Sequence, residues 1–189
     1  MCSADSAFGQ TGKAPVNYLG VAGPLIFNNT NYQLVWTSHP SEGYYKQEYL
    51  PAGQKVDRFQ SMLMLEAVSS KLVLKEVIGA KINELDEMKR SNPFVNYDMI
   101  FNKATNEYIL DFLLTVNTAD NSQVSVAEHN VYRYKSLPLR SGGNGVFLLA
   151  ISTRSYGRET TAFIKNLRSS RAGLVSKLAA WKISLPDLK

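Results

Sequence analysis

Two carboxylates stand inside the two most strand-like segments of the chain, and their types could do chemistry. Asp111 lies in the apolar segment 107–117, and Glu128 lies in the segment 123–135, which follows after a polar turn. Runs rich in β-branched and aromatic residues on both sides of such a turn are typical of a β-hairpin. A turn near residues 119–120 would place Asp111 opposite a residue near Glu128.

Neighbouring carboxylates can perform general acid–base catalysis, as in glycosidases. They can also form ion pairs on an open sheet face, because a carboxylate among apolar residues is costly unless it is exposed or paired. Arg133 and Arg154 are the candidate partners, since the next strand pair should place Glu128 opposite a residue near Thr153. We favour the ion pairs and keep a binding site and a catalytic pair as alternatives.

Aromatic residues are frequent on the predicted strands. Most should support the core, with tyrosine hydroxyls reaching solvent, but some could line a groove for a peptide, glycan or lipid. Trp36 and Tyr45 are the ones that we select. The candidate binding residues are therefore Asp111, Glu128, Arg133, Arg154, Trp36 and Tyr45.

Other catalytic and metal-binding patterns are missing from the sequence. His39 and His129 have no further histidine or cysteine at ligand spacing, so neither a metal site nor a cofactor is predicted. Cys2 lies near the start of the chain, and no Gly-x-Ser-x-Gly motif occurs. The glycine-rich segment 142–145 precedes a strand instead of a helix, unlike a phosphate-binding loop. These observations favour a protein without catalytic activity.

The hydrophobic patterns predict an α+β fold in which helices pack against an antiparallel sheet. Strand pairs come first, followed by one helix, a four-strand meander and a long C-terminal helix. The expected strands are 25–27, 32–37, 44–50, 61–68, 95–103, 107–117, 123–135 and 145–153, and the expected helices are 71–90 and 159–181. The pattern also predicts that residues 38–43 end the second strand, that residues 56–60 form a short helical turn, and that Ser69-Ser70 cap the first helix. Segment 145–153 is almost wholly apolar and should lie centrally in the sheet.

The N-terminal residues bear on domain organisation and location. We expect a flexible leader or a signal-peptide remnant over residues 1–24 and a single α+β domain over 25–189. Ala7-Phe8-Gly9 has the small-x-small form of a signal cleavage site, and Cys2 could be the remnant of a lipidated cysteine. We therefore expect export to the periplasm or beyond the cell, with a lipid anchor left open. A cytoplasmic protein is the alternative.

The positive charge is concentrated in the C-terminal segment. Residues 154–189 carry a net charge of +6, whereas the residues before them carry −1. The ordinary interpretation is a solvated helix face. The alternative is peripheral contact with an anionic membrane through Lys165, Arg168 and Arg171. Nucleic acid is disfavoured as a partner, because aromatic residues are not interleaved with these charges.

The order of elements over about residues 25–182 resembles that of PsbP-like proteins, a family of α/β/α sandwiches. The segment EYLPAGQKVDRFQSM, residues 48–62, is similar to one that recurs in small secreted bacterial proteins of unknown role. PsbP-like proteins are mostly binding or assembly proteins, so the resemblance implies a non-enzyme. We expect an exported binding or assembly module whose partner is a protein, peptide or small ligand. A hydrolase using the carboxylate pair and an anionic-surface binder are the alternatives.

Overall fold

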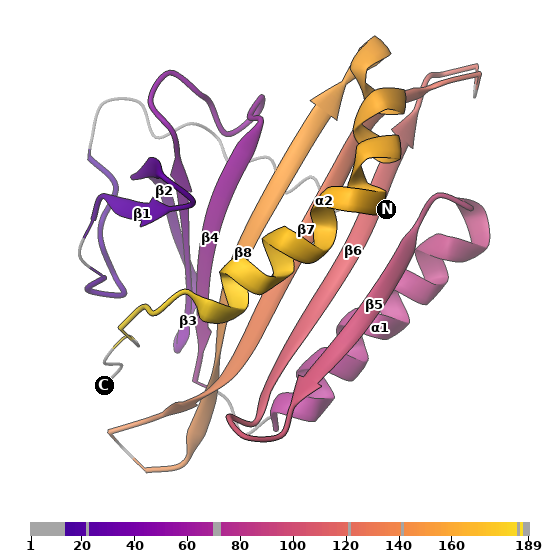
Figure 1. Cartoon of the computed structure of the whole chain (residues 1–189). Helices are drawn as coiled ribbons and strands as arrows, with labels where there is room; N and C mark the ends of the chain where they lie inside the picture. Colours follow the sequence, from indigo (N-terminus) through magenta and orange to yellow (C-terminus); the bar gives the residue numbers. More distant parts are fainter. Residues whose placement is uncertain are drawn as a thin grey trace.

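Eight antiparallel strands form one open sheet (Figure 1). The computed structural model describes residues 14–21, 23–69, 73–120, 122–140, 142–184 and 186. The strands are β1 (Leu25–Phe27), β2 (Thr30–Ser41), β3 (Tyr44–Leu50), β4 (Ser61–Val68), β5 (Asn96–Asn102), β6 (Glu107–Asn117), β7 (Val124–Pro138) and β8 (Asn144–Tyr156). Their order in the sheet is β1-β2-β3-β4-β8-β7-β6-β5, so two consecutive meanders meet where β4 pairs with β8.

The two helices, α1 (Leu74–Ser91) and α2 (Thr160–Ala180), cover opposite faces of the sheet. Successive side chains of a strand point to opposite faces, so each face has a core of its own. The α1 face packs Ile78 and Leu85 against Leu110, Phe112, Tyr134 and Leu148. The α2 face packs Val175 and Leu178 against Leu63, Leu65, Val131 and Leu149. In Figure 1, α2 crosses in front of the sheet. The predicted α+β class, with helices packed on an antiparallel sheet, agrees with this arrangement.

Strand β8 is the central element. It pairs with β4 on one side and with β7 on the other, and every residue from 145 to 152 is buried. A strand covered on both faces needs apolar residues at every position, which explains the unbroken apolar run and confirms the predicted central placement.

Two predictions about local structure were wrong. Strand β2 continues through Pro40 to Ser41, although Pro40 was expected to break it. Beyond Tyr32 this strand pairs only with β3 in the described residues, and its register shifts between Ser38 and Ser41. A proline is tolerated at such an edge position, because its missing N–H is not needed there. Residues 56–60 form no helical turn, and the chain there makes a β-bridge between Lys55 and Arg58.

Helix α1 begins later than predicted. Its cap is Val73, whose backbone N–H donates to the Glu76 carboxylate at 3.1 Å. The predicted cap, Ser69-Ser70, was wrong, because Ser69 instead donates its backbone N–H to the carbonyl oxygen of Gly43 at 2.7 Å, next to the Tyr44–Val68 pair of β3 and β4. Ser70 lies outside the described residues.

The packed part of the chain starts before residue 25. Leu19 and Val21 are buried in the core of the α2 face, and the N–H of Leu19 donates to Oε1 of Gln47 at 2.7 Å. The predicted leader was therefore too long at its C-terminal end. Cys2 and Ala7-Phe8-Gly9 lie outside the described residues, so export stays a prediction. No helix within the described ranges has the length and apolarity needed to cross a bilayer.

Candidate functional site

The predicted opposition of Asp111 and Glu128 was wrong. Asp111 lies opposite Val131, and Glu128 lies opposite Leu114, a displacement of three positions. An odd displacement reverses the face of every side chain, so the two carboxylates point to opposite faces of the sheet. The cause is the turn, in which the N–H of Thr118 donates to the carbonyl oxygen of Gln123 at 2.8 Å, together with a register shift between Val116 and Asn117. These carboxylates cannot act together as a catalytic pair.

Glu128 forms an ion pair on the α1 face. It lies directly opposite Arg154, whose Nε donates to its carboxylate, and the amide of Asn130 donates to its second oxygen at 3.0 Å. The Arg154 guanidinium also lies over the ring of Phe59, 4.1 Å from its centroid. Both oxygens of Glu128 are therefore satisfied within the sheet.

Asp111 is the centre of a charged cluster on the α2 face. Its side chain is 6% exposed and accepts two hydrogen bonds, from Nε2 of His129 at 2.7 Å and from Nε of Arg171 at 2.9 Å. Arg171 also bonds Asp98 on the neighbouring strand. Burial raises the pKa of Asp111, but His129 and Arg171 together hold it below its ordinary value. Strands β5, β6 and β7 and helix α2 thus each contribute one member of the cluster.

Arg133 lies farther along the same face and fastens the end of α2 to the sheet. Its guanidinium donates to the carbonyl oxygens of Leu178 at 3.0 Å and Trp181 at 2.8 Å. It also donates to the carboxylate of Glu107 at 2.9 Å, and Lys135 lies 2.8 Å from the same carboxylate. Burial raises the pKa of Glu107, but Lys135 and Arg133 lower it overall. These bonds explain Arg133 as a structural residue.

The six predicted binding residues do not converge. Trp36 lies on the α1 face, with the Lys46 ammonium 5.8 Å from its ring centroid. Tyr45 packs against the α2-face core and stacks on His39 at a centroid distance of 4.3 Å. Three of the six, Trp36, Glu128 and Arg154, belong to the α1 face, and the other three belong to the α2 face.

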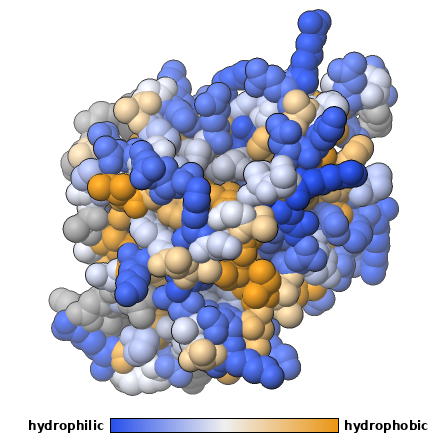
Figure 2. Space-filling view, in the orientation of Figure 1, coloured by the Kyte–Doolittle hydropathy of each residue, from blue (hydrophilic) through white to orange (hydrophobic). Residues whose placement is uncertain are grey.

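A cleft lies beside Asp111, between α2 and the segment that joins α1 to β5. Its volume is about 470 Å³. We call it the Arg171 cleft. Its polar lining is Lys89, Asn96, Asp111, His129, Arg168 and Arg171, and its apolar lining is Pro93, Phe94, Val95, Phe112, Leu113, Ile164 and Leu167. Hydrophobic and hydrophilic residues also lie side by side on the visible surface of this face of the molecule (Figure 2).

His129 lines this cleft. All buried side-chain nitrogen and oxygen atoms in the described residues have hydrogen-bond partners. Nε2 of His129 is bound to Asp111, whereas Nδ1 has no partner in the same part of the chain. Nδ1 is therefore not fully buried, although the ring as a whole is buried. Because Asp111 fixes the ring, Nδ1 is oriented before any ligand arrives.

Sequence reasoning did not identify this cleft, although one signal was available. Ile164, Leu167, Arg168 and Arg171 are spaced three and four residues apart, so they share one face of α2. That face was interpreted as part of a basic surface together with Lys165. The structure instead turns Arg171 toward the sheet, while Lys165 is exposed and does not line the cleft.

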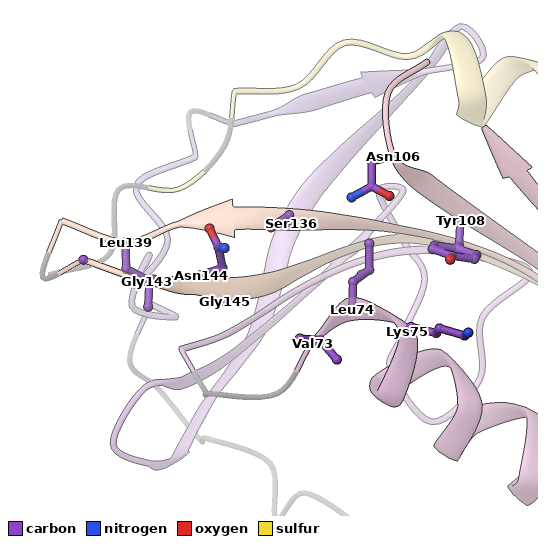
Figure 3. A pocket seen from close by; sticks show the side chains of 11 residues that line it. Val73, Leu74, Lys75, Asn106, Tyr108, Ser136, Leu139, Gly143, Asn144 and Gly145 are labelled. Atoms are coloured by element: carbon purple, nitrogen blue, oxygen red, sulfur yellow. The ribbon is translucent and has the colours of Figure 1, made fainter. Parts of the chain in front are cut away.

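A second depression, of about 560 Å³, lies between the start of α1 and the turns β5–β6 and β7–β8 (Figure 3). Among the described residues of its lining, Lys75 is the only charged one, and its side chain extends away from the glycine-rich turn at 142–145. The N–H of Val73, the cap residue of α1, is already bonded to Glu76. This depression brings together fewer reactive side chains than the Arg171 cleft. Among the described residues, no group of three His, Cys, Asp or Glu could hold a metal ion.

Comparisons with known proteins agree with the boundaries of the fold. No curated protein and no solved structure matches the chain. A family model matches residues 19–183, a stretch that begins at the buried Leu19 and ends just after α2. None of these comparisons shows a relation to PsbP-like proteins. The chain belongs to the uncharacterised family that this model describes.

Proposed function

We propose that the protein is a non-catalytic binding module whose ligand is a small organic anion with an apolar body, held in the Arg171 cleft. The observation that supports this proposal most directly is the lining of the cleft. It combines three cationic side chains with apolar walls beside an oriented histidine.

The three cationic side chains of the cleft differ in how far acidic side chains of the protein already neutralise them. Arg171 is neutralised by Asp98 and Asp111. Lys89 donates only to the amide oxygen of Asn96, at 3.2 Å, and Arg168 forms no ion pair within the described residues. Lys89 and Arg168 therefore carry positive charge that an incoming carboxylate can accept, since charge-assisted hydrogen bonds are stronger than neutral ones.

The apolar side chains of the cleft favour a ligand whose body is apolar. Phe94 is 45% exposed, and Ile164 and Leu167 of α2 are half-buried on the opposite side of the cleft. A ligand that covered these side chains would gain the free energy of apolar burial, while Nδ1 of His129 offers a directed hydrogen bond.

Calorimetric titration with a series of monocarboxylates, such as octanoate and phenylacetate, tests this proposal. We expect each acid to bind at least about tenfold more tightly than its neutral primary amide, a difference typical of one charge-assisted hydrogen bond. Arg168→Gln and Lys89→Gln should each remove most of that preference. Lys165→Gln is the matched control, because it removes one charge from α2 outside the cleft. Equal binding of acid and amide, or equal effects of Arg168→Gln and Lys165→Gln, would contradict the proposal.

Export is part of the proposal on the strength of Ala7-Phe8-Gly9 and Cys2. Fractionation of bacterial cells that produce the full chain should recover it outside the cytoplasm. Recovery of the full-length chain from the cytoplasm would contradict export without bearing on the cleft.

A further inference from the structure

Strand β5 forms one edge of the sheet and is an open template for another strand. It is the last strand in the sheet order and pairs only with β6 in the described residues (Figure 1). An edge strand leaves alternate backbone N–H and C=O groups free on its outer side. Met99, Ile100 and Phe101 on this strand are 47%, 46% and 41% exposed. Backbone groups and apolar side chains are therefore available along the same seven residues.

Most of the usual protections of an edge strand are missing from β5, and its one charged side chain, Asp98, is bound by Arg171. Within Asn96–Asn102 there is no proline and no lysine, and its pairing with β6 shows no register shift. The opposite edge differs, because β1 has only three residues and β2 is irregular and contains Pro40. An unprotected apolar edge is a site where another chain is expected to pair.

We propose that a second copy of this chain pairs antiparallel with β5, in a register centred on Met99, so that two sheets join into one. This register places Met99 opposite the same residue of the second copy, and Tyr97 opposite Phe101. These three side chains share the α1 face, because they oppose Phe112, Leu110 and Tyr108 of β6. Paired aromatic and apolar side chains of this kind stabilise antiparallel strands.

Charge also fits a second copy. Asp98 is the only charged residue of β5 and is bound by Arg171. In the proposed register Asp98 lies opposite Ile100, so no two like charges face each other, and Asn96 lies opposite Asn102. A partner strand must be apolar at alternate positions and almost uncharged, and β5 itself meets both conditions.

The size of the contact sets the expected affinity. A pair of seven-residue strands is smaller than a standard interface, which buries about 1,600 Å². We therefore expect a dimer that dissociates at concentrations on the order of micromolar. In sedimentation velocity, the wild-type chain should change from monomer to dimer between roughly 1 and 100 µM.

Cysteine cross-linking tests the register. In a Cys2→Ser background, Met99→Cys should form an intermolecular disulfide under mild oxidation, because directly opposed Cβ atoms lie within disulfide reach. Ile100→Cys is the matched control, since the two copies of residue 100 lie diagonally and too far apart. Stronger cross-linking at residue 100 than at residue 99 would overturn the proposed register.

Phe101→Lys tests the edge itself, because an inserted charge blocks strand pairing. The variant should remain monomeric at 100 µM with an unchanged far-ultraviolet circular dichroism spectrum. A wild-type chain that stays monomeric at that concentration, or a folded Phe101→Lys variant that dimerises equally well, would overturn the proposal. If the wild-type chain stays monomeric, a strand from a different protein is the remaining partner for this edge.

Discussion

Two carboxylates on opposite faces of the sheet, Asp111 and Glu66, differ in their cationic partners and therefore in the direction of their pKa shifts. Asp111 on the α2 face is held by His129 and Arg171, and its pKa lies below the ordinary value. Glu66 on the α1 face has one cationic partner, Lys46, which it shares with Glu48. Burial raises the pKa of Glu66, and Lys46 and the Tyr44 hydroxyl do not fully reverse that effect.

Burial raises the pKa of both carboxyls and is the largest cause for each. For Asp111 this effect is outweighed by two donors, Arg171 from α2 and His129 from β7. For Glu66, Lys46 and the Tyr44 hydroxyl do not outweigh it. On the α2 face, the surroundings of Asp111 stabilise its charged form. On the α1 face, the surroundings of Glu66 disfavour its charged form.

The largest effect is expected for Asp111→Ala. The substitution leaves His129 and Arg171 without the carboxylate that pairs them, and breaking such a buried pair costs about 3–5 kcal/mol. Urea denaturation should therefore show a large loss of stability. Asp98→Ala is the matched control on the other side of Arg171, because its side chain is 64% exposed and a surface ion pair contributes about 1 kcal/mol or less. Similar losses for both variants would remove the distinction between a buried centre and its exposed partner.

An intermediate effect is expected for Arg133→Gln. Two carbonyl groups at the end of α2 lose their donor, and since only the bond to Leu178 is buried, the loss should be that of one unsatisfied buried group, about 1–3 kcal/mol. Lys135→Gln removes the ammonium group that pairs with Glu107 and leaves the bonds to α2 intact. Its cost should therefore stay below about 1 kcal/mol. Hydrogen exchange should reveal faster opening of residues 174–180 in Arg133→Gln alone. Unchanged exchange there would show that α2 is held by its apolar contacts.

The smallest effect is expected for Glu66→Gln at neutral pH, within about 1 kcal/mol and in the direction of greater stability. A neutral amide can still accept from the Tyr44 hydroxyl and no longer repels Glu48. The pH dependence sharpens this test. Because the folded-state pKa of Glu66 lies above 4.5, the folded state binds more protons, and wild-type stability should fall as pH rises through and above that value.

Asp111 and Glu107 act in the opposite direction. Their pKa values are lowered from 3.8 and 4.5, so their contribution is complete above those values and is lost as pH falls below them. Denaturation of wild type and Glu66→Gln between pH 4.5 and 8 should show a stability difference that grows with pH. A constant difference over that range would place Glu66 in the same class as Asp111.

Local structure was largely predictable from the sequence. The strands 44–50, 61–68 and 107–117 have the predicted bounds. Alternating residues and flanking Gly, Pro or Asn residues fix such segments without help from the rest of the chain. The long apolar run of β8 likewise predicted its central position in the sheet.

The candidate site was not predictable to the same degree, for a geometric reason. One turn and one register shift before Asn117 decide which face Asp111 and Glu128 occupy, and neither leaves a clear pattern in the residues. His129 was tested only as a metal ligand, although its parity with Val131 places it on the buried face. The cationic lining of the cleft comes from Lys89 at the end of α1 and from Arg168 and Arg171 of α2, residues that are far apart in the sequence and meet only in the folded chain.

The meeting of the two meanders has a consequence for how the chain folds. Every other strand pair of the described sheet joins neighbours along the chain, whereas β4 and β8 pair Ser61 with Thr153 and Val68 with Val146. Contacts so distant in sequence form only after the entropy of closing a long loop has been lost, so they set the folding rate. Each half can assemble its hairpins early, and docking of β8 on β4 is then the slow step. A chain cut between β4 and α1 would retain every local pairing, and its two fragments would reassociate through the β4–β8 pairing and the packing of α2 on the first half.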